Sequence, residues 1–394
     1  MSVATTDVRR DGMSADRSRS ATAPGPMDRV YFLHVWVLMA AGIVFVFSAS
    51  FPMAGRPDAM MMPGNPFHYL VRHSIYVGFA LLAMLVVSRI RPRSIRRAAV
   101  PAFVVSIILM VMAVYSPWGV TRGGAPRWLA IPGLPEFQPS ELAKFAVIML
   151  FAGVLARKDE GRDERVPAFL AIILMTGLII GILLLQRDQG MATIFAVMAA
   201  SFLLFAGMKL LWLIPMVLSG LGTALLIAYL TDYRWIRITA FLNPEEAPAD
   251  AAYHILNMLA AQARGGILGV GLGRSPDKWG ALPAPHTDSI FSVIGGELGI
   301  FGALIIIALV IAMAHRGMRI AQQARTPYGF YLAAGVTAML ILQSLAHIAV
   351  NASCMPCTGL TLPFVSAGGT SLLAVSIAAG FVLSVSRYEG GDET

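Results

Sequence analysis

The sequence has few charged residues, and this shortage sets its class. Asp, Glu, Lys and Arg make up only 13% of its 394 residues, whereas hydrophobic residues make up 57%. A soluble globular domain carries about 25% charged residues. The composition therefore excludes an ordinary soluble domain and indicates a protein that crosses a membrane several times.

Two features of other protein classes are also missing. The first 29 residues lack the apolar core and the cleavage site of a signal peptide, so 1–29 is predicted to be a disordered cytoplasmic tail. His, Cys and Asp residues do not cluster at metal-ligand spacing. The only cysteines, Cys354 and Cys357, have a C-x-x-C spacing that allows a disulfide on an oxidising side of the membrane, but the βαβ context of a thioredoxin-like site is absent.

Long apolar stretches account for most of the chain. A helix needs about 20 mostly apolar residues to cross a bilayer. We predict ten spanning helices, at 30–51, 68–88, 98–116, 141–156, 167–185, 190–207, 210–230, 289–313, 328–351 and 362–385. The predicted fold is an all-α membrane protein of about ten spans, with one large loop, about 231–288, between spans seven and eight.

The Lys and Arg residues gather in alternate loops, and this pattern indicates the orientation. They are frequent in the N-terminal tail and in the loops after spans two, four, six and eight. These loops and both termini are therefore predicted to be cytoplasmic, and the large loop to lie outside. The same rule explains the net charge of +8. The basic loops lack interleaved aromatic residues and a binding fold, so no nucleic-acid partner is expected.

Charged residues near the outer ends of the spans are the first site candidates. Glu141 and Lys144 are three residues apart at the start of span four, so they share a helix face and can form an ion pair. Such pairs within a membrane usually line a functional cavity. Asp188, between spans five and six, either caps span six or adds charge to an external cavity. We expect Arg72, beside His73 at the start of span two, to reach the membrane interface rather than a cavity.

Asp288 stands where the large loop returns to an apolar helix, and it is the leading candidate for chemistry, although it could simply cap that helix. Glu297 lies nine residues further along, on about the same helix face, and needs an Arg or Lys partner from another span. The glycines of 265–273 follow no strand, so a dinucleotide-binding fold is not expected, and flexible backbone near a ligand remains open. An amphipathic helix is predicted over 253–263.

One further polar pattern lies in span nine. Gln343, His347 and Asn351 are four residues apart and form a stripe along the helix. Such a stripe favours hydrogen bonds between helices over contact with a substrate.

These residues predict a charged cavity at the outer membrane surface. It would hold the carboxylates of Asp288, Glu141 and Asp188 and cations from Arg127, Lys144 and either Arg234 or Arg237. A substrate with an anionic head group and a long lipid tail would fit. Proton transport is the competing class, but the charges gather on one side and form no row through the bilayer.

The motifs around these residues resemble the shape, elongation, division and sporulation (SEDS) family, the FtsW/RodA/SpoVE group. The motifs are Arg127-Trp128 with Gln138 to Lys144, Gln186 to Gly190, Tyr233-Arg234 with Arg237, Phe241 to Glu245, Leu282-Pro283 with His286 to Asp288, Glu297 to Gly299, and Gly359 to Phe364 with Ser366. The resemblance covers about 30–387, leaving 388–394 as a short cytoplasmic tail. The stretch from Gly271 to Ser275 is most similar to the cell-division branch, FtsW.

The resemblance implies a peptidoglycan glycosyltransferase that polymerises lipid II in cell division, at the outer face of the bacterial cytoplasmic membrane. Asp288 would act as general base, and undecaprenyl pyrophosphate would leave. The residues expected to bind substrate are Arg127, Trp128, Glu141, Lys144, Asp188, Arg234, Arg237, His286 and Glu297.

The same resemblance implies the partners and the alternatives. A class B penicillin-binding protein and other divisome proteins are the expected partners. No cofactor is certain, although a divalent cation, Mg²⁺ or Mn²⁺, could stabilise the leaving group. The alternatives are the same activity in cell elongation, a lipid II flippase, and a non-catalytic divisome scaffold.

Overall fold

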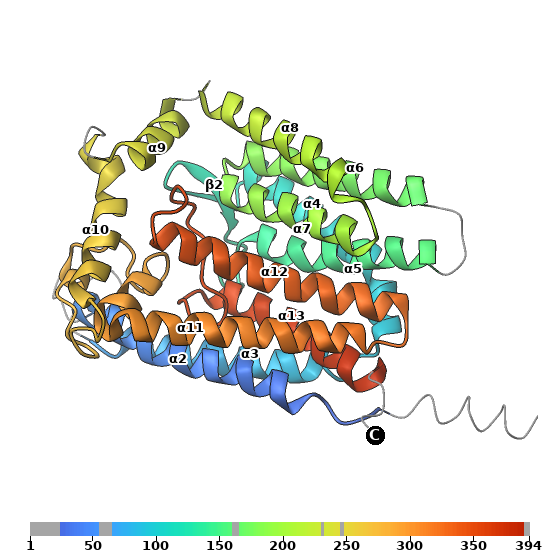
Figure 1. Cartoon of the computed structure of the whole chain (residues 1–394), viewed down its shortest axis with the longest axis horizontal. Coiled ribbons are helices and arrows are strands. Elements are labelled where there is room, and N and C mark those ends of the chain that lie inside the picture. The colour runs from blue at the N-terminus through green and yellow to red at the C-terminus, as the bar shows by residue number, and fades with distance from the viewer. Residues whose placement is uncertain (1–23, 55–64, 160–164, 230–231, 245–247, 390–394) are drawn as a thin grey trace, which may run out of the picture.

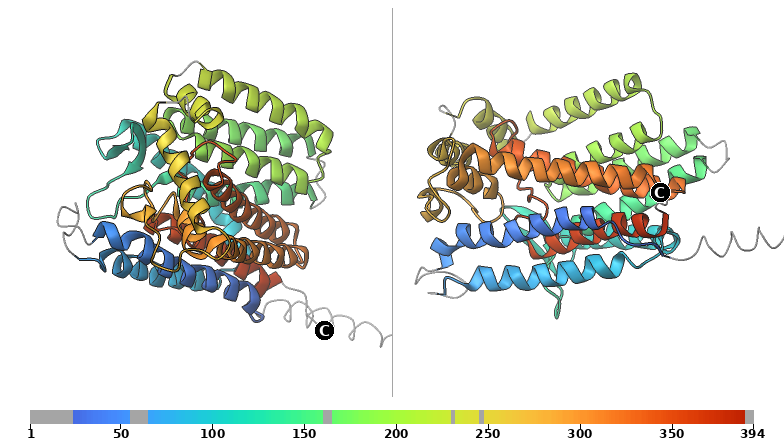
Figure 2. Two further views of the ribbon diagram at one scale, coloured as in Figure 1. Left: turned by 60° about the vertical axis from the view of Figure 1, so that its left-hand side comes forward. Right: turned by 60° about the horizontal axis from the view of Figure 1, so that its bottom comes forward.

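The computed structural model describes residues 24–54, 65–159, 165–229, 232–244 and 248–389. Ten long helices run alongside one another (Figure 1), and one of them, Leu210–Tyr229, lies at the edge, apart from the others (Figure 2). They are α2 (Arg29–Ala54), α3 (His68–Val87), α4 (Pro92–Tyr115), α5 (Pro139–Asp159), α6 (Arg165–Leu185), α7 (Gln189–Phe205), α8 (Leu210–Tyr229), α11 (Ile290–Gln322), α12 (Pro327–Asn351) and α13 (Gly369–Glu389). Most of the two predicted tails, 1–29 and 388–394, lies outside the described residues.

The ten helices match the ten predicted spans, and the all-α membrane class is confirmed. Eight of the described helices are long and apolar enough to cross a membrane, and α7 is an apolar helix of 17 residues. α5, α12 and α13 are mostly buried inside the bundle, whereas α3 and α4 turn most of their surface outward. Small residues permit close helix packing, since a Cβ at Gly380 of α13 would overlap Val87 of α3.

The two ends of the bundle differ (Figures 1 and 2). The end on the left of Figure 1 carries α9 (Asp232–Leu242), α10 (Ala249–Gly265) and the short 3-10 helix η1 (Asp277–Trp279), and we call it the α10 end. The opposite end carries the start of α2 and the end of α13, where the Gly25 N–H donates to the Arg387 carbonyl. Both ends of the described chain therefore lie on one side of the bundle, as the basic loops predict.

Two local predictions are wrong, and each has a physical cause. The Gly and Pro residues of 121–128 predict an irregular loop, but antiparallel strands β1 (Gly119–Arg122) and β2 (Ala125–Leu129) form a hairpin there. The two residues between the strands are glycines with positive φ, as a two-residue hairpin turn requires. The last span begins at Gly369 instead of 362, because Phe364 has a left-handed φ of 66° that a helix cannot contain, and the chain before Gly369 is not helical.

The large loop is tied to α11 through backbone hydrogen bonds. α11 bends at Gly299, whose φ of 66° and ψ of −162° lie outside the helical region. At the bend, the Ile300 N–H donates to the Gly266 carbonyl at 3.0 Å, and the Gly271 N–H donates to the Glu297 carbonyl at 2.9 Å. The glycine cluster of the loop therefore packs against a helix backbone.

A buried ion pair strengthens this attachment. The Lys278 Nζ lies 2.8 Å from the Glu297 Oε1 and 3.0 Å from the Ser48 Oγ of α2, and the Ser48 hydroxyl donates to the same carboxylate at 2.6 Å. All three side chains are buried. Glu297 thus has the cationic partner that a carboxylate in an apolar helix needs, but the partner comes from η1 in the large loop and not from another span.

Two alanine substitutions would test the close packing of the loop on α11. Gly269 and Gly273 have nearly identical φ values, 80° and 79°, but a Cβ at Gly269 would overlap the Glu297 carbonyl oxygen, while one at Gly273 would have nothing within 4 Å. Gly273→Ala should cost about 1–2 kcal/mol of unfolding free energy from the left-handed backbone alone.

Gly269→Ala should cost roughly 1–3 kcal/mol more, because backbone atoms must move apart. Unfolding of the two variants in the same detergent measures the difference. Equal losses in both variants would show that the loop does not pack against α11 as described.

Candidate functional site

A cavity of about 1150 Å³ lies at the α10 end of the bundle. Its walls come from the first turns of α3, α5 and α7, from the β1–β2 hairpin, from the turn before α11 and from the loop between α12 and α13. Six of the ten predicted site residues line it: Arg127, Trp128, Glu141, Asp188, His286 and Asp288. The fold thus gathers residues from distant parts of the chain around one space.

The other four predicted residues are placed differently. Lys144 is fully buried behind Glu141, with its Nζ 2.9 Å from the Glu141 Oε2. Glu297 belongs to the buried ion pair that holds the large loop, and it does not line the cavity. Arg234 and Arg237 belong to α9, but their side chains fall outside the described part of the structure.

Arg72 and His73 of α3 line the cavity, so the expectation that Arg72 reaches only the membrane interface is wrong. The Arg72 guanidinium lies 5.9 Å from the centre of the Tyr76 ring, and the Tyr69 ring lies 5.0 Å from that of His286. Burial and the nearby charge of Arg72 lower the pKa of His286 to about 4, so its imidazole is neutral at pH 7. This side of the cavity therefore offers the Arg72 guanidinium beside the uncharged ring of His286.

Three consecutive carbonyl groups fix the turn before α11. The His286 carbonyl accepts from the Ala367 N–H (2.8 Å), that of Thr287 from the Ser366 hydroxyl (2.9 Å), and that of Asp288 from the Asn351 amide (3.0 Å). The donors come from α12 and from the loop that follows it. The backbone of the turn is therefore held in place while the Asp288 side chain lines the cavity.

The Asp288 carboxyl has an altered affinity for protons. Burial raises its pKa to about 6, although the Thr287 side chain and the positive charge of Arg127 act in the opposite direction. An ordinary aspartate has a pKa of about 3.9. A carboxylate that titrates closer to neutral pH is a stronger base, so Asp288 is well suited to accept a proton from a bound hydroxyl.

Asp188 fulfils both of its predicted roles. It caps α7, since its Oδ1 accepts from the Met191 N–H at 3.2 Å, and it lines the cavity. The Gln138 Nε2 donates to its Oδ2 at 2.9 Å, and the Arg127 Nη1 lies 3.7 Å from its Oδ1. Burial raises the pKa of Asp188, and the Arg127 charge opposes that effect. Arg127 therefore links the two aspartates of the cavity through its charge.

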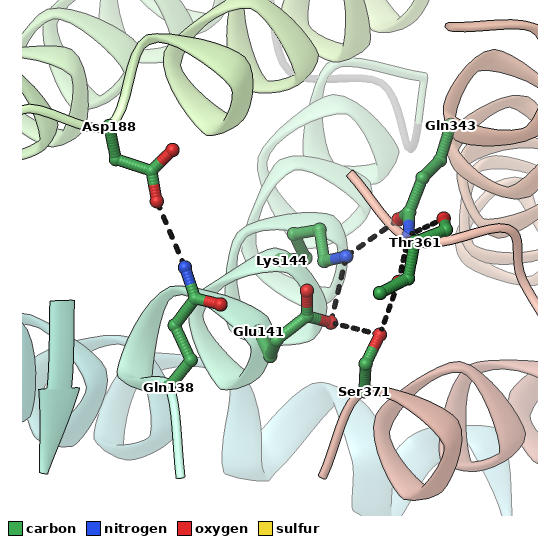
Figure 3. Close-up of polar contacts among 7 residues, drawn as sticks. All are labelled: Gln138, Glu141, Lys144, Asp188, Gln343, Thr361 and Ser371. Carbon is green, nitrogen blue, oxygen red and sulfur yellow. Dashed lines mark hydrogen bonds and ion pairs between the residues drawn. The ribbon is translucent and has the colours of Figure 1, made fainter. Parts of the chain in front are cut away.

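A closed ring of polar contacts supports the wall formed by α5 (Figure 3). Lys144 bridges the Glu141 carboxylate and the Gln343 Oε1, at 2.9 and 2.7 Å. The Gln343 Nε2 donates to the Thr361 carbonyl at 3.0 Å, and the Thr361 and Ser371 hydroxyls are 2.9 Å apart. The Ser371 hydroxyl donates to the Glu141 Oε2 at 3.3 Å, which closes the ring. The predicted pair of Glu141 and Lys144 thus joins α5, α12, α13 and the loop between the last two helices.

The polar stripe of α12 connects this ring with the Asp288 turn. Its middle residue is His347, whose Nδ1 lies 2.7 Å from the Leu360 carbonyl oxygen. The Asn351 Oδ1 accepts from both the N–H and the hydroxyl of Ser292 in α11, at 3.2 and 2.8 Å. Each member of the stripe therefore bonds to another segment, and the prediction that the stripe joins helices is confirmed.

Sequence reasoning missed one charged pair at the wall formed by the β1–β2 hairpin and the residues that follow it. The Arg122 Nη2 lies 2.6 Å from the Glu136 Oε2, and the Arg122 guanidinium lies 5.5 Å from the centre of the Trp128 ring. All three residues line the cavity. Their contact depends on the β1–β2 register, which is irregular after Val120, and no sequence pattern indicates that register.

The described residues offer little for a metal. Among them, no group of three or more His, Cys, Asp and Glu side chains is placed to hold a metal ion. Cys357 lines the cavity, and the structure shows no disulfide between it and Cys354. The chemistry available from the described residues is that of carboxylates, guanidinium groups and neutral rings.

Comparison with known proteins agrees with this arrangement. A family model for FtsW, RodA and SpoVE, described as a cell cycle protein, matches residues 28–390. A probable peptidoglycan glycosyltransferase FtsW from Geobacter metallireducens is 36% identical over 364 residues, which cover 92% of this chain and 96% of the relative. A protein of the same name from Coxiella burnetii is 35% identical over 355 residues, covering 89% and 94%.

Solved structures show the same fold. A chain from a study of the structural coordination of polymerization and crosslinking by a peptidoglycan synthase complex has a TM-score of 0.73 and 26% identity, covering 91% of this chain and 97% of that one. The rod shape determining protein RodA of Thermus thermophilus has a TM-score of 0.68 and 25% identity, covering 92% and 98%. The bundle, the cavity and these relatives lead to one conclusion: this chain is a multi-pass membrane protein of the FtsW/RodA/SpoVE family of cell cycle proteins.

Proposed function

We propose that this protein is a peptidoglycan glycosyltransferase that polymerises lipid II during cell division. The observation that carries the proposal is Asp288, a carboxyl with a pKa raised to about 6 on a fixed turn in a large cavity. The curated relatives named FtsW favour division over elongation. The basic loops support a bacterial cytoplasmic membrane orientation with both termini in the cytoplasm and the cavity outside.

The shape of the site suits a lipid-linked substrate. A groove of about 860 Å³ runs along α3, where Val71, Ile75 and Phe79 form part of an apolar wall. Arg72 and Tyr76 line both this groove and the cavity. A lipid tail in the groove would place its phosphates beside the Arg72 guanidinium and its sugars in the cavity.

In this arrangement Asp288 acts as general base. Its carboxylate takes the proton of the acceptor's GlcNAc 4-hydroxyl, and the oxygen bonds to C1 of the donor MurNAc as the bond from C1 to the pyrophosphate breaks. The pyrophosphate keeps the electron pair and leaves on its lipid, and the configuration at C1 is inverted. Arg72 and Arg127 would stabilise the developing negative charge.

A divalent cation has no assigned step in this mechanism. Mg²⁺ commonly binds through one or two carboxylates together with substrate phosphates. The cavity carboxylates do not form a metal site by themselves, so such an ion would have to arrive with the pyrophosphate. We also propose a class B penicillin-binding protein as partner, in line with the peptidoglycan synthase complex among the structural relatives.

Replacing the proposed base tests the proposal. In polymerisation of labelled lipid II by the purified protein with its transpeptidase partner, Asp288→Asn should lose at least about 100-fold in rate, since it removes the base. Asp159→Asn is the matched control. Asp159 is the last residue of α5, at the end of that helix away from the cavity, and it accepts a hydrogen bond from the Tyr331 hydroxyl. This variant should retain the wild-type rate.

Two other results would overturn parts of the account. Polymer from Asp288→Asn at the wild-type rate would remove Asp288 as the base. No polymer from the wild-type complex, combined with movement of lipid II across vesicle membranes, would replace the transferase with a flippase.

The pH dependence gives a second test. Only the ionised carboxylate accepts a proton, so the rate should rise with pH, reach half its maximum near pH 6 and level off above it. An ordinary aspartate would place the midpoint near about pH 3.9. Initial rates between pH 5 and pH 8 measure the midpoint, and a profile that stays flat down to pH 5 would contradict the raised pKa.

A further inference from the structure

One stretch of the large loop has no polar side chain. Residues 265–273 read Gly-Gly-Ile-Leu-Gly-Val-Gly-Leu-Gly, between Arg264 and Arg274. Ile267, Leu268 and Leu272 are 64%, 80% and 53% exposed. Such a group of aliphatic side chains is costly to keep in water, so its surroundings need an explanation.

Backbone contacts fix this stretch beside the outward surface of α11. The Gly266 carbonyl accepts from the Ile300 N–H, and the Ile267 carbonyl lies 3.5 Å from the Phe301 nitrogen. Ile300 and Phe301 are themselves exposed, as are Leu304 and Ile305 one turn further along the same apolar helix. The aliphatic side chains of the loop therefore continue the exposed apolar surface of α11.

The depth of this contact along α11 places it within a membrane. His315 and Arg316 mark the polar end of the span on the side of the chain termini. Phe301 lies fourteen residues before His315, or about 21 Å at about 1.5 Å per residue. The hydrocarbon core is about 30 Å thick, so Phe301 and the loop beside it lie well inside it.

The loop backbone is suited to such a place. Irregular backbone is tolerated in hydrocarbon only where its polar groups find partners. The Gly269 N–H donates to the Gly265 carbonyl at 2.8 Å, and those of Val270 and Gly271 donate to α11 carbonyls at 3.1 and 2.9 Å. At the borders, Arg264 pairs with Asp277, and the exposed Trp279 suits the membrane interface.

We propose that residues 265–273 lie within the hydrocarbon of the membrane leaflet on the cavity side, where acyl chains cover Ile267, Leu268 and Leu272. The segment acts as a short lipid anchor. It holds η1 and the end of α10 at a fixed depth beside α11. The inference depends on the membrane fold alone and is independent of the proposed catalytic activity.

Depth-dependent quenching tests this inference on the full-length protein in phosphatidylcholine–phosphatidylglycerol vesicles. In a Cys354→Ser, Cys357→Ser background, Leu268→Cys is labelled with an environment-sensitive fluorophore. Ile305→Cys, on the outward face of α11, is the lipid control, and Thr121→Cys, exposed on the hairpin, is the water control. We expect Leu268→Cys to be quenched by doxyl-labelled lipids like Ile305→Cys and to lose the quenching by aqueous iodide that Thr121→Cys shows.

Two results would overturn the proposal. Iodide quenching at Leu268→Cys equal to that at Thr121→Cys would place the loop in water. Protection that appears only when other membrane proteins are added, without doxyl quenching, would identify a protein and not lipid as the occupant. Leu272→Cys repeats the measurement at a second position if Leu268→Cys does not yield folded protein.

Discussion

Hydrogen bonds from one face of α12 determine the shape of the cavity. Gln343 holds Lys144, His347 holds a carbonyl of the loop that leads to α13, and Asn351 holds the carbonyl of Asp288. In lipid, helices are held together by close packing and by hydrogen bonds, since the lipid is as apolar as their side chains. Polar contacts of this kind therefore add to the apolar packing that places α5, α11 and α13 relative to one another. Losing one of them would leave buried polar atoms without partners.

The first turns of α11 are fixed from two sides. On one side, Asn351 of α12 bonds to Ser292 of α11. On the other side, Lys278 of the large loop bonds to Glu297 of α11. α11 bends at Gly299, just beyond these contacts, where the Ile300 N–H donates to the Gly266 carbonyl of the large loop. The part that carries the Asp288 turn is therefore held by both α12 and the loop. A proposed base held in this way loses little free energy to reorganisation when a substrate arrives.

The features that sequence could predict are those that depend on local order. Apolar runs of about 20 residues identify the spans, and the spacing of Glu141 and Lys144 identifies their pairing. The sequence does not predict that Arg72 lines the cavity, because an apolar helix gives no signal of its rotation about its own axis. The sequence predicts that Glu297 needs a cation, but it does not identify Lys278, because that choice depends on the packing of η1 against α2 and α11. Contacts between distant segments depend on packing that no local pattern encodes.

The most direct test of this account is the turnover rate of Asn351→Ala in lipid II polymerisation. Asn351 contacts the backbone of Asp288 and does not line the cavity, so the turnover rate should fall by up to about 100-fold while KM stays close to that of the wild type. Ser344→Ala is the matched control, since Ser344 is a buried polar residue of α12 that bonds only within its own helix among the described contacts. It should lose less thermal stability than Asn351→Ala, because it gives up a single bond within its own helix, and it should keep its turnover rate. Equal turnover rates in the two variants would contradict the claim that the α12 stripe positions Asp288.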